Sequence, residues 1–350
     1  MDSYKVIGLM SGTSLDGLDI AFCSFKFSNK WEYKILDAET IDYSEEMRQG
    51  LATLATSTAL EFSKFHSSYG RFCGEMVAEF VRERKLQVDF IASHGHTIFH
   101  QPSLGFSTQI GSGAALSAAS GLPVICDFRS VDVALGGQGA PLVPLGDELL
   151  FGDYTACLNL GGIANISFKD NGKRIAFDIS VCNILFNYLA HKKGKNFDEN
   201  GEIAGSGRVN GQLLEQLNSL PYYKSEYPKS LGREDVDKII AKYFDENQFD
   251  LSVEDLMATA VEHVVMQIAG FTGKGSLLIT GGGAFNKFLI SRLRQLSLAE
   301  LHVPDPLLVN YKEALIFAFL GLKRWRSEFN CLKSVTGAKK DNIGGAVYLS

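Results

Sequence analysis

A polar loop between two apolar stretches has the residue types of an anion-binding site. Residues 11–17, Ser-Gly-Thr-Ser-Leu-Asp-Gly, follow the apolar run Val6–Leu9 and precede Leu18–Phe27, a pattern that predicts strand, loop and strand. Oriented backbone N–H groups can surround a phosphate, and glycine lets its oxygens come close. The segment lacks the GxxxxGK signature of a P-loop. It is interpreted either as a phosphate cradle or as a hairpin turn built from turn-forming residues.

Two carboxylates, those of Asp16 and Asp19, lie in or beside this loop. Either could hold Mg²⁺ through water, because Mg²⁺ prefers carboxylate, water and phosphate oxygens. Direct ligation of a metal by the protein is not expected.

Two further glycine turns follow strand-like segments in the second half of the chain. Asn159, Gly161 and Gly162 repeat the design of the first loop, with Asn165 just beyond, and the turn 281–283 leads from a strand into a helix. Such a turn at a helix N-terminus favours a phosphate or the remainder of a nucleotide. Three turns of this kind predict a nucleotide site in a cleft between two lobes.

Asp178 is the candidate for acid–base chemistry. It follows the apolar segment Ile175–Phe177 and precedes a predicted helix over 183–191. A carboxylate at the end of a strand can activate a hydroxyl or a water. The alternative role is the N-cap of that helix, and the spacing favours neither.

Histidine and arginine side chains follow other predicted strands. His94, His96 and His100 resemble a metal cluster, but residues i and i+2 near a strand end lie apart, and hydrogen bonding to a polar substrate or to the protein is favoured over metal ligation. Arg129 could pair with a substrate carboxylate. The alternative for Arg129 is an internal ion pair with Asp132.

The surrounding elements predict an α/β protein with two similar lobes. A helical stretch over 44–84 carries an aromatic stripe at intervals of three and four, which is expected to face a core. The strand, glycine loop and strand unit occurs near the start of each half, as in an internal repeat. We therefore predict lobes over residues 1–148 and 149–350, with the possibility that the last helix packs back on the first lobe.

Composition excludes several classes of function. The chain has 350 residues, of which 35 are glycine and 8 proline, and a formal charge of -6, so it lacks the basic footprint of a nucleic-acid-binding protein. The six cysteines form no CxxC pair and are interpreted as buried free thiols. With no apolar run of membrane-spanning length and no signal-like start, we expect a cytoplasmic protein.

The sequence resembles the anhydro-N-acetylmuramic acid kinase family from end to end. The motifs that carry the resemblance are 8–19, 93–97, 127–132 with 136–141, 159–165, 228–235, 280–286 and the tail 335–338. The family belongs to the hexokinase, actin and heat-shock ATPases. This resemblance implies two ribonuclease-H-like lobes with an interlobe nucleotide cleft, ATP and Mg²⁺ as cofactors, and a homodimer.

The resemblance also implies a reaction and roles for residues. ATP, water and 1,6-anhydro-N-acetylmuramic acid would give ADP and N-acetylmuramic acid 6-phosphate, in bacterial recycling of cell-wall sugars, with Asp178 as the general base on the attacking water. The matching ATP-binding positions are Gly12, Thr13, Ser14, Leu15, Asp16, Gly17, Leu18, Asp19, Asn159, Gly161, Gly162, Gly281, Gly282 and Gly283. The matching substrate-binding positions are His96, Thr97, Arg129, Asp132 and Glu313.

The chain departs from the family pattern at two places. The family usually has Thr-Gly-Pro-Gly-Asn after the catalytic aspartate, where this chain has Ile-Ser-Val-Cys-Asn over 179–183, and it usually has Gln at the position of His96. The alternatives are therefore a kinase for a different amino or anhydro sugar, and a non-catalytic, regulatory ATP-binding protein.

Overall fold

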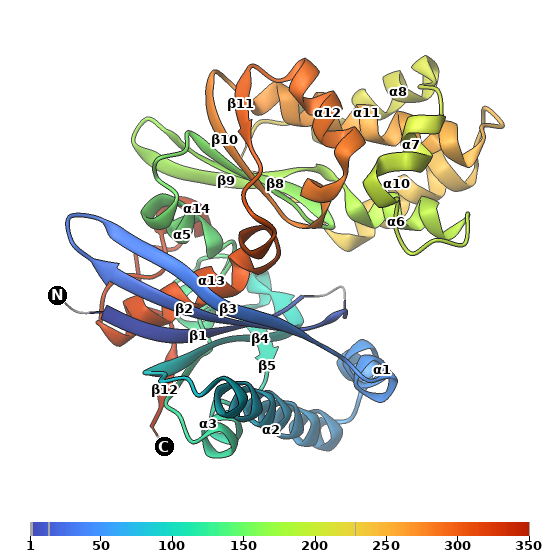
Figure 1. The fold of residues 1–350 in the computed structure, drawn as a ribbon. Helices are drawn as coiled ribbons and strands as arrows, with labels where there is room; N and C mark the ends of the chain where they lie inside the picture. Colours follow the sequence, from blue (N-terminus) through green and yellow to red (C-terminus); the bar gives the residue numbers. More distant parts are fainter. Residues whose placement is uncertain (1–2, 13–14, 228, 350) are drawn as a thin grey trace. The chain divides into compact units, whose positions relative to one another are not determined.

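The computed structural model describes residues 3–12, 15–227 and 229–349, which form two compact units. The first unit comprises Met1–Phe151 with Tyr311–Ser350, and the second comprises Gly152–Asn310 (Figure 1). The C-terminal segment thus groups with the N-terminal residues.

The first unit is built on a seven-stranded sheet of order β12-β6-β4-β1-β2-β3, with β5 paired to β4. Its strands are β1 (Ser3–Ser11), β2 (Gly17–Phe27), β3 (Trp31–Asp42), β4 (Phe90–Gln101), β5 (Phe106–Ile110), β6 (Val124–Cys126) and β12 (Ala346–Tyr348). β1, β2 and β3 are antiparallel neighbours, whereas β4 runs parallel to β1 and β6 parallel to β4.

The second unit repeats this arrangement in a five-stranded sheet of order β11-β10-β7-β8-β9. Its strands are β7 (Ala156–Leu160), β8 (Ile163–Asp170), β9 (Lys173–Val181), β10 (Gly275–Thr280) and β11 (Ala299–His302). Again the first three strands are antiparallel and the last two extend the sheet in parallel. The prediction of an α/β fold with two ribonuclease-H-like lobes is therefore confirmed.

Helices cover both faces of the first sheet. They are α1 (Glu45–Thr53), α2 (Ala59–Arg84), α3 (Gly113–Ser120), α4 (Ser130–Ala134), α5 (Val143–Leu150) and α14 (Lys333–Thr336), together with α13 (Pro306–Trp325), which leads in from the second unit. In Figure 1, α2 and α3 lie side by side on one face and α13 on the other. A Cβ atom at Gly8 in β1 would overlap the backbone oxygen of Ala314, so α13 approaches the sheet at a position that only glycine permits.

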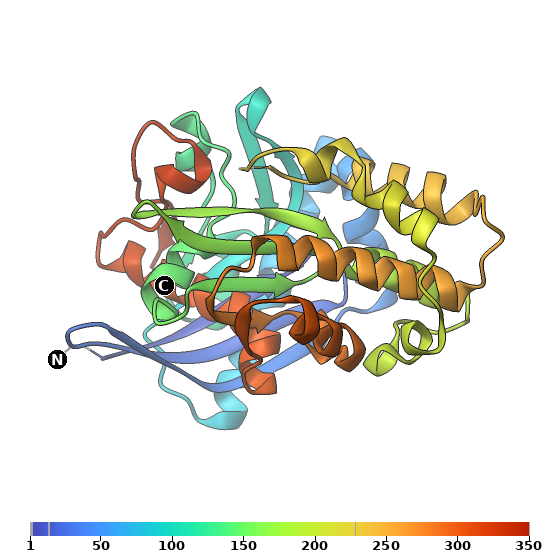
Figure 2. The same cartoon turned by 90° about the horizontal axis from the view of Figure 1, so that it is seen from above.

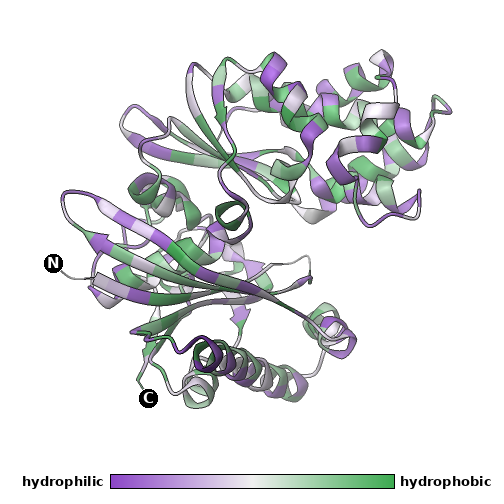
Figure 3. Cartoon of the chain, in the orientation of Figure 1, coloured by the Kyte–Doolittle hydropathy of each residue, from purple (hydrophilic) through white to green (hydrophobic). Residues whose placement is uncertain are grey.

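The predicted helical stretch over 44–84 is two helices rather than one. Thr58 caps α2 by accepting a hydrogen bond from the N–H of Glu61, whose side chain bonds back to the N–H of Thr58, and this capping box starts a new helix after a 3₁₀ turn over Leu54–Thr56. Tyr69 and Phe80 of the aromatic stripe are buried, which confirms that it faces a core. Both hydrophobic and hydrophilic residues run along α2 in Figure 3, as expected of an amphipathic helix.

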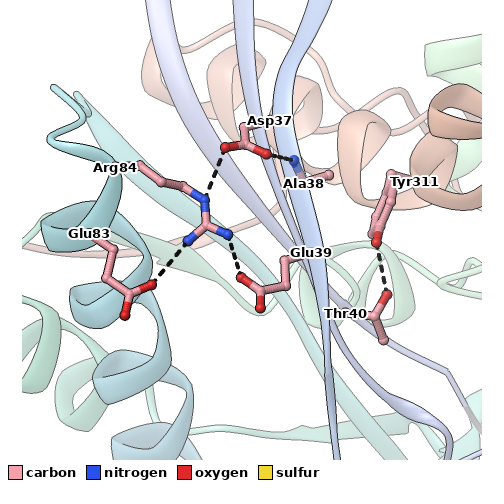
Figure 4. A network of polar contacts seen from close by, with 7 residues as sticks. All are labelled: Asp37, Ala38, Glu39, Thr40, Glu83, Arg84 and Tyr311. Carbon is pink, nitrogen blue, oxygen red and sulfur yellow. Dashed lines mark hydrogen bonds and ion pairs between the residues drawn. The ribbon is translucent and has the colours of Figure 1, made fainter.

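Ion pairs join the C-terminal end of α2 to β3. Arg84 donates from Nε to Asp37 at 3.0 Å and from Nη2 to Glu39 at 2.7 Å (Figure 4). Beside them, the hydroxyls of Thr40 on β3 and Tyr311 on α13 lie 3.1 Å apart, a contact that connects the two elements.

In the second unit, the helices gather around α11. They are α6 (Asn183–His191), α7 (Glu202–Ser206), α8 (Gly211–Asn218), α9 (Pro221–Lys224), α10 (Arg233–Ile240), α11 (Val253–Phe271) and α12 (Lys287–Leu296). α11 contacts α6, α7, α8, α12 and β9, so it forms the middle of the helical layer (Figure 2). The polar segment 221–235 contains α9 and the start of α10.

The cysteines and the hydropathy of the helices bear on two general features of the chain. All six cysteines are buried free thiols, as predicted. No helix in the described part of the chain is both long enough and apolar enough to cross a membrane.

Candidate functional site

In the first unit, the predicted phosphate loop joins the antiparallel strands β1 and β2. Leu15 has a positive φ of 62°, and its N–H donates to the carbonyl oxygen of Gly12 at 3.3 Å. Thr13 and Ser14 lie outside the described residues. Asp19, on β2, accepts a hydrogen bond from Thr40 at 2.7 Å. Burial raises the pKa of Asp19, with a further contribution from the negative charge of Asp16.

A buried group of hydroxyls adjoins this loop. Ser11, the last residue of β1, has its Oγ 2.8 Å from Nδ1 of His96 on β4. The hydroxyl of Tyr43 donates to the same Oγ at 2.7 Å and lies 2.6 Å from the hydroxyl of Tyr69. Burial lowers the pKa of His96 to about 4, so its imidazole is neutral at physiological pH.

His94, two residues earlier on β4, contacts a different partner. Arg129 donates from Nη2 to Nε2 of His94 at 2.7 Å and from Nη1 to the carbonyl oxygen of Gly139 at 2.5 Å. Because guanidinium can only donate, Nε2 of His94 is the acceptor, and Nδ1–H donates to the carbonyl oxygen of Gly95 at 2.9 Å. Nε of Arg129 is buried without a hydrogen-bond partner.

The alternative of an Arg129–Asp132 ion pair is wrong, since both side chains bond elsewhere. Asp132 is completely buried, and its Oδ2 accepts from the N–H of Gly139 at 2.8 Å. Its Oδ1 accepts from Cys331 Sγ at 3.0 Å, Thr336 Oγ1 at 2.8 Å and Asn342 Nδ2 at 2.8 Å. Asp132 therefore joins the 136–139 loop to the C-terminal segment.

Glu313 and Thr97 complete the predicted substrate residues of the first unit. Burial raises the pKa of Glu313, the positive charges of Lys312 and Arg129 oppose this rise, and the negative charge of Asp19 adds to it. Thr97, next to His96, accepts a hydrogen bond from Gln109 at 3.3 Å. The pKa of Glu313 is thus affected by the charges of both Arg129 and Asp19.

In the second unit, the two glycine turns meet. A Cβ atom at Gly281, where φ is 82°, would overlap Oδ1 of Asn159, and a Cβ atom at Gly283 would lie 2.8 Å from Cβ of Leu160. Asn183 fixes the turn at 161–162 by two hydrogen bonds. Its backbone N–H donates to the carbonyl oxygen of Gly161 at 3.2 Å, and its side-chain amide donates to the carbonyl oxygen of Leu160 at 2.8 Å. Gly281 precedes a 3₁₀ turn over Gly282–Phe285 rather than α12 directly.

Asp178 lies inside β9, three residues before its end, and not at the strand terminus as predicted. The N-cap of α6 is Cys182, so the alternative role of Asp178 as that cap is wrong. Its Oδ2 accepts from the N–H of Leu231 at 3.0 Å, whereas Oδ1 has no hydrogen-bond partner among the described residues. Burial raises the pKa of Asp178, and the Leu231 hydrogen bond opposes this rise.

The residues after Asp178 belong to the hydrophobic core. Ile179, Val181 and Cys182 are buried, and Val181 pairs with Ile163 on β8. The apolar segment after Asp178 therefore extends β9 by strand pairing and side-chain burial.

The backbone of Asp178 is held by residues that the sequence did not single out. The hydroxyl of Tyr222 donates to the carbonyl oxygen of Asp178 at 2.6 Å. The N–H of Asp178 donates to the carbonyl oxygen of Lys229 at 3.1 Å. The hydroxyls of Tyr223 and Ser180 are 3.2 Å apart. The sequence signal that could have pointed to these residues is the tyrosine pair Tyr222–Tyr223, which lies just before the motif at 228–235.

In the described part of the chain, no group of three or more His, Cys, Asp or Glu side chains is arranged to hold a metal ion. His94 and His96 instead bond to Arg129 and Ser11, respectively.

Comparisons with known proteins agree over the whole chain. A family model described as anhydro-N-acetylmuramic acid kinase matches residues 4–350. The protein of that name from Shewanella denitrificans is 34% identical over 364 residues, covering 98% of this chain and 97% of the relative. The one from Coxiella burnetii is 36% identical over 377 residues, covering 99% and 98%.

Similarity to solved structures is more distant. The activator of the 2-hydroxyisocaproyl-CoA dehydratase from Clostridium difficile, with bound ADPNP, is 13% identical with a TM-score of 0.45, covering 92% of this chain and 97% of the other. The family assignment rests on the full-length sequence matches. By these matches, the chain belongs to the anhydro-N-acetylmuramic acid kinase family.

Proposed function

We propose that the chain is an ATP-dependent kinase that converts 1,6-anhydro-N-acetylmuramic acid and water to N-acetylmuramic acid 6-phosphate, in the recycling of cell-wall sugars. The observation that carries this proposal beyond family membership is the state of Asp178. Its side chain is partly buried, its pKa is raised, and among the described residues only Oδ2 is occupied by a protein donor. Oδ1 remains available to a water molecule.

Asp178 would act as the general base. A raised pKa strengthens the carboxylate as a proton acceptor while leaving it ionised above that pKa. Oδ1 would take a proton from water as the water oxygen bonds to the anomeric carbon. The bond between that carbon and the bridging oxygen breaks, and this oxygen, now O6 of the sugar, attacks the γ-phosphorus of ATP and displaces ADP.

ATP would be held by the three glycine-containing turns. In the first unit these are residues 12–19, and in the second they are Asn159 with 161–162 and 281–283. Asp16 and Asp19 would hold Mg²⁺ through water, and the raised pKa of Asp19 fits this role because a nearby cation relieves the cost of ionising that buried carboxylate. When bound, Mg²⁺ neutralises charge on the phosphate oxygens.

The sugar would bind to His96, Thr97, Arg129 and Glu313 in the first unit. Arg129 is suited to a substrate carboxylate because it is cationic and partly buried, and its Nε–H has no hydrogen-bond partner among the described residues. Asp132 would act by positioning, because the protein donors already bond both of its carboxylate oxygens.

Three wider features belong to the same proposal. The lobe over 1–148, joined by the last helix, and the lobe that begins at 149 would each contribute residues to nucleotide binding, two chains would form a homodimer, and the enzyme would work in the cytoplasm. Their support is the match of the chain to the family over residues 4–350.

The test is a product assay in ¹⁸O-labelled water with ATP, Mg²⁺ and the anhydro sugar. We expect ADP and a 6-phosphorylated reducing sugar that carries label at the anomeric carbon. Asp178→Asn should abolish most turnover and retain ATP binding by calorimetry, whereas the control Asp170→Asn, on the neighbouring strand β8, should be unaffected. ATP binding without a sugar product would favour a regulatory protein, and turnover only with another amino or anhydro sugar would favour a different substrate.

A further inference from the structure

We propose that a directed chain of hydroxyl groups holds His96 as the Nε2–H tautomer and thereby makes it a hydrogen-bond donor to an acceptor oxygen of the bound sugar. The chain runs from Tyr69 through Tyr43 and Ser11 to His96, with successive separations of 2.6, 2.7 and 2.8 Å. The donor role rests on the proposed function, whereas the tautomer rests on these contacts alone.

Counting hydrogens fixes the direction of the chain. The hydroxyl of Tyr43 donates to Oγ of Ser11. A tyrosine hydroxyl has one hydrogen, so the hydrogen between Tyr43 and Tyr69 comes from Tyr69. The single hydrogen of Ser11 must also find an acceptor, and we assign it to Nδ1 of His96, which lies 2.8 Å from Oγ of Ser11. The proton of neutral His96 is therefore on Nε2.

Burial keeps these groups in this arrangement. The side chains of Ser11, Tyr43, Tyr69 and His96 are all nearly inaccessible, with exposed fractions of 3%, 3%, 1% and 3%. Buried hydroxyls without partners are costly, so reversing one member would leave an orphaned hydrogen elsewhere in the chain. The arrangement therefore specifies one tautomer rather than a mixture.

The consequence for recognition lies at the other ring nitrogen. Within the described part of the chain, Nε2 of His96 has no hydrogen-bond partner, and as Nε2–H it can donate but cannot accept. The glutamine that the family usually has at this position offers both a donor and an acceptor. His96 therefore selects an acceptor oxygen, such as a carbonyl, ether or hydroxyl oxygen, at this point of the sugar.

The neighbouring His94 provides an internal reference. Because Arg129 donates to Nε2 of His94, that ring carries its proton on Nδ1. Two histidines separated by one residue on β4 are thus assigned opposite tautomers.

The first experiment is nuclear magnetic resonance on ¹⁵N-histidine-labelled full-length protein, with His96→Gln and His94→Gln used to assign the two rings. Long-range ¹H–¹⁵N correlations distinguish the tautomers. We expect Nε2–H for His96 and Nδ1–H for His94. A Nδ1–H pattern at His96 would overturn the proposal irrespective of enzymatic activity.

The second experiment adds the anhydro sugar to the same sample and follows the Nε2 resonance of His96. A shift on saturation, without one in His96→Gln, is expected of a donor in contact with the sugar. Binding of the sugar with an unmoved His96 resonance would exclude the donor role. Absence of any phosphorylation of the sugar would instead count against the proposed function and leave the tautomer result standing.

Variants then test the hydroxyl chain. Tyr43→Phe removes the hydroxyl that donates to Ser11. Ser11→Ala removes the hydroxyl that donates to His96, so the two variants interrupt the chain at different members. Each should raise the KM for the sugar roughly fivefold or more while leaving the KM for ATP within about twofold. Tyr348→Phe, in β12 of the same sheet, is the matched control and should change neither. An unchanged KM for the sugar in both variants would overturn the role of the chain.

Discussion

Asp19 and Asp178 lie on corresponding rungs of the two repeated sheets, but on different strands. In the first unit, Asp19 of β2 pairs with Met10 and with Thr40 of β3. In the second, the place of Asp19 is taken by Asn165 of β8, and its partner on β9 is Asp178. Each sheet thus has one carboxylate at the same level: Asp19 adjoins the proposed phosphate loop, and Asp178 is the proposed base.

Tyr222→Phe tests whether the backbone clamp on Asp178 contributes to catalysis. Loss of the 2.6 Å hydrogen bond to the Asp178 carbonyl should loosen β9 at this residue. We expect kcat to fall roughly threefold to tenfold, and unfolding free energy by about 1 kcal/mol, with unchanged KM values. Tyr223→Phe, which removes the contact with Ser180, is the control and should retain kcat. Equal losses of kcat in both variants would contradict a specific role for Tyr222.

Glu313→Gln should stabilise the protein in a pH-dependent manner. The pKa of Glu313 is raised above its ordinary value of 4.5 by burial, so the folded state holds this proton more tightly than the unfolded state. Below 4.5 the group is neutral in both states, and as the pH rises through the folded pKa the wild type loses stability that the Gln variant keeps. The stability difference should therefore grow from acid to neutral pH.

Urea denaturation across this pH series measures the difference between wild type and Glu313→Gln. Glu79→Gln, at an exposed position of α2, should show no such trend. A gap that shrinks as the pH rises would contradict the direction assigned to the pKa of Glu313.

Gly281→Ala tests whether the backbone conformation at this turn requires glycine, and Gly282→Ala tests whether ATP contacts the turn. A Cβ atom at Gly281 meets Asn159 and Leu160 at a positive φ, so this variant should lose about 1–3 kcal/mol of unfolding free energy. At Gly282 the nearest atom, Nδ2 of Asn183, is 3.8 Å away, and stability should hardly change. If the nucleotide approaches the Gly282 backbone, calorimetry will record weaker ATP binding by this stable variant; unchanged affinity would remove Gly282 from the ATP site.

Asp132→Asn should destabilise the first unit. The carboxylate accepts four hydrogen bonds, and an amide NH₂ in place of either oxygen would face a donor. We expect a loss of about 2–4 kcal/mol by chemical denaturation. Asp341→Asn, in the same C-terminal segment, is the milder control. A variant of native stability with a raised KM for the sugar would instead identify Asp132 as a direct substrate contact.

The local sequence pattern was sufficient to predict the helix that follows Asp178. The predicted segment Asn183–His191 coincides with α6. The end of β9 could not be predicted in this way, because pairing of Val181 with Ile163 carries the strand past Asp178.

The sequence could suggest candidate site residues but not their hydrogen-bond partners. Arg129 and Asp178 could be selected as candidate side chains from their neighbours in sequence. Their hydrogen bonds to His94 and Tyr222 span 35 and 44 residues, and they arise only when distant strands and loops pack together. The directions of the pKa shifts depend on the same packing and burial.

The burial of all six cysteines makes the native chain a suitable background for site-specific labelling. Burial raises the pKa of Cys73, Cys126 and Cys182 to about 12, which keeps these thiols protonated and poorly nucleophilic. One cysteine introduced at an exposed position in each unit would therefore react selectively with maleimide dyes. Fluorescence energy transfer between the two dyes would then report the separation of the units during turnover, without prior removal of any native cysteine.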